Sequence, residues 1–329
     1  MSLLQKAIRR GNQELALRAA SNLLQSNPER FRRRIAVILF EDIGMGAPDI
    51  IASVLPAVTR RGWSQHGRDG WGLVPSLIDR MCESAKCRAV DDLLVMIGWD
   101  PSLERLKRDI ENLNSGDLLQ RLYSSLDVIE RAIVLLHLSG NLRSQENISP
   151  AKQLGPTAVW NLLREIGCSE NLISLARLGK TAGAGEMPII YALLSLYVGE
   201  GAPAHVSDQF PSEGCVGGVP GWAFDVHVRE GNRALSAFLQ TDALTAKLVR
   251  KHVPGKGRRA FLGGLLFRVE SGLVSNRLQW PLGATFRSIA DTNVHGVDPE
   301  IAQQISQQLT HDIPLLNEVR NHVIASNPS

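Results

Sequence analysis

The sequence predicts an all-α protein, a bundle of many short helices. Apolar residues recur at helical spacing through most of the 329 residues, and strand-like alternation is sparse. Residue pairs that begin helices, such as Asp100-Pro101 and Ser149-Pro150, recur along the chain. A hydrophobic content of 44% is ample for a packed core, and 21% charged residues are too few for a disordered tail.

Cap residues predict where the first helices begin and end. Ser2 is expected to cap a helix over residues 3–10, which Gly11 ends. Asn12 should cap the next helix, over residues 13–25. Further helices are expected over 28–42, from Pro48, over 101–112, over 118–138, and from Ser149-Pro150, Thr157 and Ser169.

Two loop-rich stretches divide the helical pattern, at residues 62–72 and 199–221. We therefore expect a helical region over 1–198, a loop-rich connection over 199–221, and a C-terminal helical region over 222–329 that packs on the first.

Composition excludes several classes of protein. The net charge of +3 is too small to indicate nucleic-acid binding by itself. The four cysteines form no Cys-x-x-Cys pair, so we expect no metal site and no cofactor. No apolar run reaches the roughly 18 residues of a membrane span, and the N-terminus lacks a signal-peptide core, which together predict a cytoplasmic protein.

An acidic helix end follows an arginine-rich helix near the N-terminus. Glu41 and Asp42 lie where the helix dipole is negative, so a cationic group should neutralise them. The expected candidates are Arg30, Arg33 and Arg34, or a neighbouring subunit. Gly44 suits the left-handed residue after the helix.

This order of elements, from Lys6 to Pro48, resembles the C-terminal helical domain of the RarA/MgsA-type AAA+ ATPases, which is related to the clamp-loader collar. In that family a Glu-Asp-Ile-Gly segment follows an Arg-Arg-containing helix at this spacing. The resemblance covers about the first 50 residues and implies assembly roles for the matching residues Arg33, Arg34, Glu41, Asp42 and Gly44.

The resemblance also implies a homo-oligomer with a role in DNA replication, recombination or repair. No ATPase module is recognised in the sequence: Gly179-Lys180-Thr181 imitates a Walker A end, but it lacks the earlier glycine and the preceding strand. The first hypothesis is therefore a non-enzymatic, DNA-associated assembly protein, with a separate AAA+ ATPase as a partner.

A basic turn near the C-terminus is the predicted contact with DNA phosphates. Glycines flank its charged side chains and free main-chain amides to approach an anion. The alternative is a solvated turn. The predicted nucleic-acid-binding residues are Lys256, Arg258, Arg259, Arg229, Arg233 and Lys251.

Asp225, His227 and Arg229 carry the alternative enzyme hypothesis. The carboxylate could orient the imidazole and the arginine could bind phosphate, which would suit a phosphoester- or nucleotide-processing enzyme. A structural hydrogen bond between the first two residues is the competing interpretation. A third hypothesis is a purely protein-binding adaptor that uses the loop at 199–221.

Overall fold

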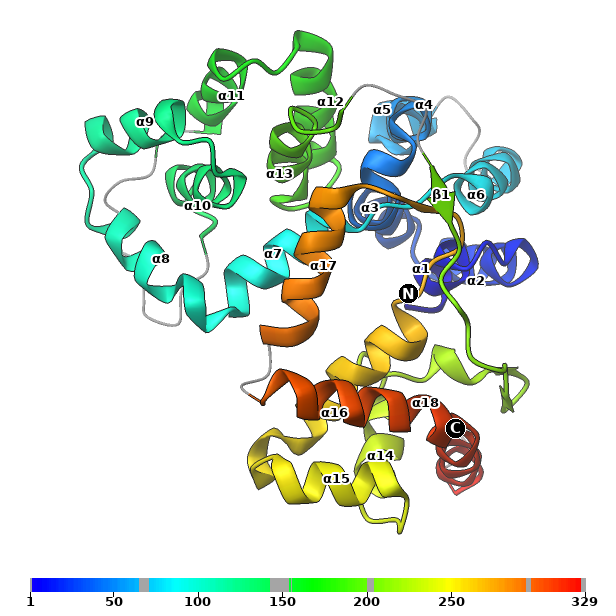
Figure 1. Ribbon diagram of the computed structural model, residues 1–329. Coiled ribbons are helices and arrows are strands. Elements are labelled where there is room, and N and C mark those ends of the chain that lie inside the picture. Colours follow the sequence, from blue (N-terminus) through cyan, green and yellow to red (C-terminus); the bar gives the residue numbers. More distant parts are fainter. Residues whose placement is uncertain are drawn as a thin grey trace.

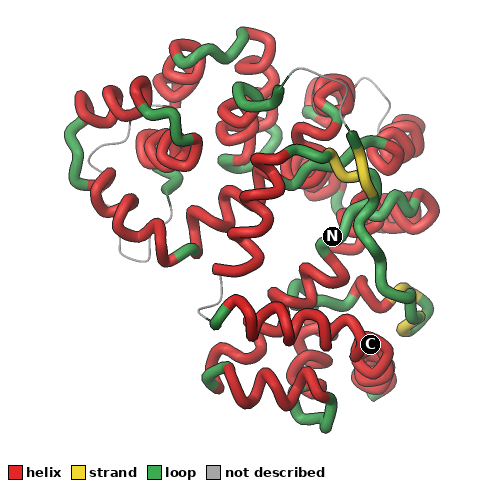
Figure 2. Tube along the Cα trace, viewed as in Figure 1, coloured by secondary structure: helices red, strands yellow, loops and turns green. Residues whose placement is uncertain are grey.

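Helices form nearly all of the regular structure, so the all-α prediction is confirmed (Figure 2). The computed structural model describes residues 2–64, 71–142, 154, 156–199, 204–293 and 297–326. The strands among these residues form two small antiparallel sheets, one pairing β1 (His205–Val206) with β4 (Arg277–Leu278) and the other pairing β2 (Cys215–Val216) with β3 (Val219–Pro220).

The first two thirds of the chain form helices α1 to α13 (Figure 1). Their bounds are α1 Ser2–Arg9, α2 Gln13–Ser26, α3 Pro28–Ile38, α4 Pro48–Val58, α5 Arg60–Ser64, α6 Val74–Glu83, α7 Ala89–Trp99, α8 Glu104–Glu111, α9 Ser115–Ser124, α10 Val128–Leu138, α11 Pro156–Glu165, α12 Glu170–Thr181 and α13 Met187–Leu194. Single turns of other geometry are the π turn η1 Leu39–Ile43 and the 3-10 turns η2 Gly44–Gly46, η3 Trp71–Leu73 and η4 Pro101–Leu103.

The described residues from 204 onward form five more α-helices. Their bounds are α14 Arg229–Phe238, α15 Leu244–His252, α16 Arg258–Leu266, α17 Pro281–Asn293 and α18 Pro299–Ala325. The 3-10 turn η6 Gly221–Ala223 precedes α14, and the 3-10 turn η7 Gly255–Gly257 and a second π turn, η8 Phe267–Ser271, lie on either side of α16.

Cap residues begin several helices where the sequence predicts. The side chain of Asn12 accepts from the main-chain N–H of Leu15 at 3.0 Å, and α2 follows. Pro28 occupies the first turn of α3, where its missing N–H costs nothing. The helix predicted over 28–42 is α-helical to Ile38 and continues as the π turn Leu39–Ile43.

The single helix predicted over residues 118–138 is wrong. The structure has two helices there, α9 and α10, with a break between them. The carboxylate of Asp127 accepts from the main-chain N–H of Ile129 at 2.8 Å and so caps α10. A cap inside an apolar pattern is the physical reason for the break.

Two hydrophobic cores organise the molecule. The first joins helices α1 to α13 and also takes in Trp222, Trp280 and Phe286. The second lies among α14, α15, α16 and α18. The chain returns to the first core between α16 and α18, because α17 packs along α7 (Figure 1). The C-terminal region therefore contacts the first region through a whole helix, and the predicted boundary at 199–221 stays a prediction.

Helix α1 ties the C-terminal region to the first core. The ammonium of Lys6 lies 2.8 Å from the carboxylate of Asp225 and donates to the carbonyl of Ala223 at 3.0 Å. Arg10 donates to the carbonyl of Glu270 at 2.7 Å. These two cations of the N-terminal segment thus hold the fold together, and Lys6 is only 2% exposed.

Candidate functional site: a charged cavity between the two cores

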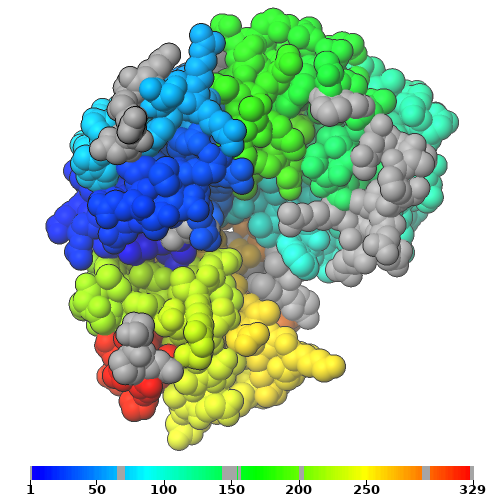
Figure 3. Space-filling model, turned by 180° about the vertical axis from the view of Figure 1, so that it is seen from behind, coloured from blue at the N-terminus to red at the C-terminus, as the bar shows by residue number. Residues whose placement is uncertain are grey.

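A cavity of about 770 Å³ lies between the two cores. Its walls come from α1, the start and one face of α7, the segment 225–227, α16 and α17, with two residues from η8 and single residues from α3, η1 and β4. Figure 3 shows the molecule hollowed between the blue N-terminal helices and the yellow segment that carries α15 and α16.

One polar face of α1 forms the first wall. Ser2, Gln5, Lys6 and Arg9 follow the i, i+3, i+4, i+7 spacing that places residues on one side of a helix. Lys6 and Arg9 are only 2% and 3% exposed. Cations so deeply buried require anionic or carbonyl partners close by.

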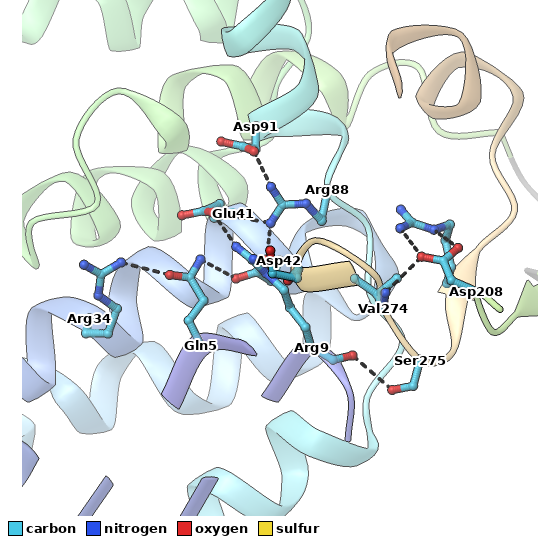
Figure 4. A network of polar contacts seen from close by, with 12 residues as sticks. Gln5, Arg9, Arg34, Glu41, Asp42, Arg88, Asp91, Asp208, Val274 and Ser275 are labelled. Atoms are coloured by element: carbon cyan, nitrogen blue, oxygen red, sulfur yellow. Dashed lines mark hydrogen bonds and ion pairs between the residues drawn. The ribbon is translucent and has the colours of Figure 1, made fainter. Parts of the chain in front are cut away.

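The carboxylate of Asp42 is the centre of the ion-pair network beside this wall (Figure 4). Arg9 and Arg88 both donate to its Oδ1, and Gln5 donates to Oδ2 at 2.8 Å. Glu41 accepts from Arg9 at 2.8 Å and from Arg88 at 3.3 Å. Burial alone would raise the pKa of Asp42, but the two guanidiniums outweigh it and hold that pKa below its usual value.

An aromatic ring lies under the same two arginines. The guanidinium carbons of Arg9 and Arg88 lie 5.2 and 5.1 Å from the ring centroid of Phe267. The imidazole of His227 meets this ring edge-on at 6.1 Å. Phe267 begins the π turn η8, so these contacts join α1 and the start of α7 to the C-terminal side of the cavity.

The outer face of α7 forms the second wall. Asp91, Val95 and Trp99 are spaced four residues apart and share one side of the helix, with Asp92 next to them. Trp99 ends the helix and is 58% exposed, which is unusual for so large an apolar side chain. The wall therefore changes from acidic to aromatic along its length.

The carboxylates of this wall are held at raised pKa. Burial is the main cause and raises the pKa of Asp91 to about 7, against the opposing charge of Arg88, to which it is ion-paired. The neighbouring carboxylates of Glu41 and Asp92 raise it further. Titratable groups perturbed by burial and by like charges in a cavity are candidates for function.

An arginine group, made of Arg268, Arg277 and Arg287, lines the cavity beside Asp92. Arg277 makes two hydrogen bonds to Asp208, at 2.9 and 2.6 Å, and Arg287 adds a third at 3.1 Å. Burial would raise the pKa of Asp208, but the hydrogen bonds and charges of these partners keep it low. Burial lowers the pKa of Arg268 to about 10.

Small residues of α16 leave the room that the cavity occupies. Ala260, Gly263 and Gly264 line it within two turns before Phe267, and their side chains are small or absent. Gly263 also allows Val226 to approach, since a Cβ on this glycine would lie 2.9 Å from the Cβ of Val226.

Asp225 and His227 both line the cavity, but among the described residues no hydrogen bond joins the Asp225 carboxylate to the His227 imidazole. Asp225 is fully buried, pairs with Lys6 and accepts from the main-chain N–H of His227 at 3.0 Å. Burial lowers the pKa of Lys6 to about 8. The imidazole is exposed, and Arg229 and Arg233 are exposed on α14. The enzyme hypothesis built on Asp225, His227 and Arg229 stays a prediction.

The basic turn lies at the start of α16, next to the cavity-lining Ala260. Lys256 and Arg259 are exposed, and so is Lys251 at the end of α15. Arg258 behaves differently, because its guanidinium donates to the carbonyls of Val253 at 2.9 Å and Arg250 at 2.7 Å. It satisfies the C-terminal carbonyls of α15 and so fixes the turn.

Local arginines do not neutralise Asp42, contrary to one of the sequence-based expectations. Arg33 pairs with Glu29 at 3.1 Å, and Arg34 donates to the side chain of Gln5 at 2.9 Å. The cations on Asp42 come from α1 and from the residue before α7. Gly44 has the expected positive φ, +47°, and a Cβ there would lie 2.4 Å from the carbonyl oxygen of Cys87.

Several residues of the site were not predicted from the sequence. Spacing on a helix could have grouped Asp91 with Trp99, but it carries no sign that this face looks into a cavity. The arginine group comes from three separate elements, η8, β4 and α17, so no local pattern joins it. The residues missed are Arg9, Arg88, Asp91, Asp92, Trp99, Arg268, Arg277 and Arg287.

Comparison of the chain with protein-family models, curated proteins and solved structures finds no match. In the described part of the chain, no group of three His, Cys, Asp or Glu side chains is arranged to hold a metal ion. None of the helices described combines the length and the apolarity that a membrane crossing requires.

Proposed function

We propose that this chain is a non-enzymatic, DNA-associated protein that holds phosphate groups on exposed cations of its C-terminal helices. The observation that carries this proposal is a set of solvent-exposed cations with no carboxylate partner among the described residues. The set consists of Arg229, Arg233, Lys251, Lys256 and Arg259.

Exposed cations without a partner suit phosphate binding for a simple reason. A paired arginine must give up its carboxylate to bind DNA, whereas an unpaired one gives up only water and releases counterions from the DNA. Helices α14 and α15 each pack against α16, which places these cations on neighbouring elements (Figure 1). The exposed carboxylate of Glu230 is the one acidic side chain adjacent to Arg229 in sequence.

The shape of the basic turn supports the same proposal. Arg258 holds the turn against the end of α15, so Lys256 and Arg259 are presented from a fixed main chain. Less side-chain and main-chain freedom is then lost on binding. Arg258 stabilises the fold, so our proposal does not count it among the phosphate-binding residues.

The resemblance of the N-terminal segment leads us to propose further that the protein is a homo-oligomer in replication, recombination or repair and works beside a separate AAA+ ATPase. Light scattering after size-exclusion chromatography tests the oligomer. A monomer at micromolar concentration would remove that part of the proposal.

Fluorescence anisotropy with single-stranded, duplex and forked DNA at several salt concentrations tests DNA binding. The variant Lys256→Gln/Arg259→Gln should bind more weakly and should lower the slope of log K against log salt by about 1.4 on single strands and 1.8 on duplex. The matched control is Arg177→Gln/Lys180→Gln, which removes two exposed cations from α12. Equal slopes for the two variants would refute the proposed surface.

A further inference from the structure

We propose that the cavity between the two cores binds a single nucleotide, with its phosphate at the arginine group and its base on Trp99. The ligand chemistry is that of a nucleoside phosphate. It comes either as a free mononucleotide or as one unstacked nucleotide of a bound strand. The inference rests on the cavity and does not depend on the basic turn.

The size of the cavity fits this ligand. A volume of about 770 Å³ lies inside the range of small-molecule sites, roughly 300 to 1,000 Å³. The small face of α16 maintains this space, since Ala260, Gly263 and Gly264 leave it open.

The arginine group is the part of the cavity that would bind the phosphate. Arg268 and Arg287 approach from two elements and would donate to phosphate oxygens, while Arg277, whose Nε and Nη2 are hydrogen-bonded to Asp208, adds its positive charge. Arg287 is 35% exposed at its side chain, so an incoming anion can reach it. An anion here would also relieve the mutual repulsion of Arg268 and Arg287.

Trp99 is the part of the cavity that would stack on the nucleotide base. Asp92, beside the arginine group, and Trp99 are seven residues apart on α7, or about 10 Å along the helix axis. A nucleotide spans this separation from its phosphate to the far side of its base. The exposed indole offers a stacking face that tolerates any base, and Val95 lies between the two ends as an apolar contact.

A carboxylate beside the phosphate end would accept from the sugar. Asp91 lines the cavity one helical turn before Val95 and has acceptor oxygens beside Glu41. Sugar hydroxyls donate hydrogen bonds to carboxylates without the desolvation cost of a second charge. Along α7 the carboxylates of Asp91 and Asp92 therefore lie at the phosphate end and Trp99 at the base end, with Val95 between them.

Isothermal titration calorimetry with AMP, ADP and inorganic phosphate tests the free-nucleotide source. We expect Trp99→Ala to weaken AMP and ADP binding about tenfold and to leave phosphate binding unchanged. Arg287→Gln should weaken all three. Trp71→Ala, at another exposed tryptophan outside the cavity, is the matched control and should bind like the native protein.

A single strand that carries 2-aminopurine tests the strand source. Its fluorescence should change on binding as the base moves from the stack of the strand onto the indole of Trp99, and Trp99→Ala should alter that signal. If Lys256→Gln/Arg259→Gln loses this fluorescence signal while its calorimetric heats of AMP and ADP binding stay unchanged, strand binding depends on the basic turn and mononucleotide binding depends on the cavity alone. The inference is overturned if Trp99→Ala, checked by its melting curve, changes neither nucleotide binding nor the strand signal.

Discussion

Replacing Asp42 by asparagine should destabilise the fold more than any neutralisation of a surface carboxylate. The substitution keeps the size of the side chain and removes the charge that Arg9 and Arg88 share at one oxygen. Breaking a buried ion pair from one side costs about 3–5 kcal/mol, because a charge stays buried without compensation. Glu41 remains bound to both guanidiniums, so we expect the lower end of this range, about 3 kcal/mol.

Urea denaturation followed by circular dichroism at pH 7 measures this change in the free energy of unfolding. Asp109→Asn is the matched control, since Asp109 is 57% exposed and lies 4.0 Å from Arg105. Its loss should stay within about 0.5 kcal/mol. A loss below about 1 kcal/mol for Asp42→Asn would refute the view that this carboxylate is the centre of the network.

The pH dependence of the stability lost in Asp42→Asn tests the role of this carboxylate independently. The folded state lowers the pKa of Asp42, so its contribution to stability is complete above the unfolded pKa, about 4, and is lost as pH falls through the folded pKa. The difference between the native protein and Asp42→Asn should therefore be constant above about pH 5 and shrink in acid. A difference that grows in acid would contradict this sign.

Three further predictions follow from single contacts. Gly44→Ala should cost about 2–4 kcal/mol in urea denaturation, because alanine resists a φ of +47° and its Cβ would overlap the carbonyl oxygen of Cys87; an unchanged midpoint would count against this. Arg258→Gln should lower the melting temperature while Arg259→Gln should not, and equal shifts would contradict the capping role of Arg258. Of the four thiols, only the exposed Cys215 should react with a thiol reagent at pH 8 in the native protein, since burial raises the pKa of the other three to between about 11 and 12; rapid labelling of a second thiol would contradict their burial.

Local signals were sufficient for most of the helices. Asn12 and Pro28 mark helix starts by chemistry that acts within three residues, so a sequence reveals them directly. The break between α9 and α10 was missed because the apolar period continues across it. The π turn at Leu39–Ile43 was also missed, since no residue type specifies a wider turn.

The candidate site depended on long-range pairing that local patterns do not contain. The need for cations beside Asp42 was predictable from the helix dipole, but their source was not. Arg88 lies 46 residues away along the chain, and the nearby arginines were the natural expectation. The cavity itself arises where α1, α7, α16 and α17 meet, which no single segment encodes.

Helix α7 packs against α17 and is synthesised well before that helix, which covers it. Helix α7 ends at Trp99, and its partner begins at Pro281, about 180 residues later. At roughly 5–20 residues per second, α7 is made on the order of 10 to 40 s before α17 exists to cover it. During that interval its apolar side is a binding surface for chaperones, and slow synthesis or a premature stop before α17 would release a chain prone to aggregate.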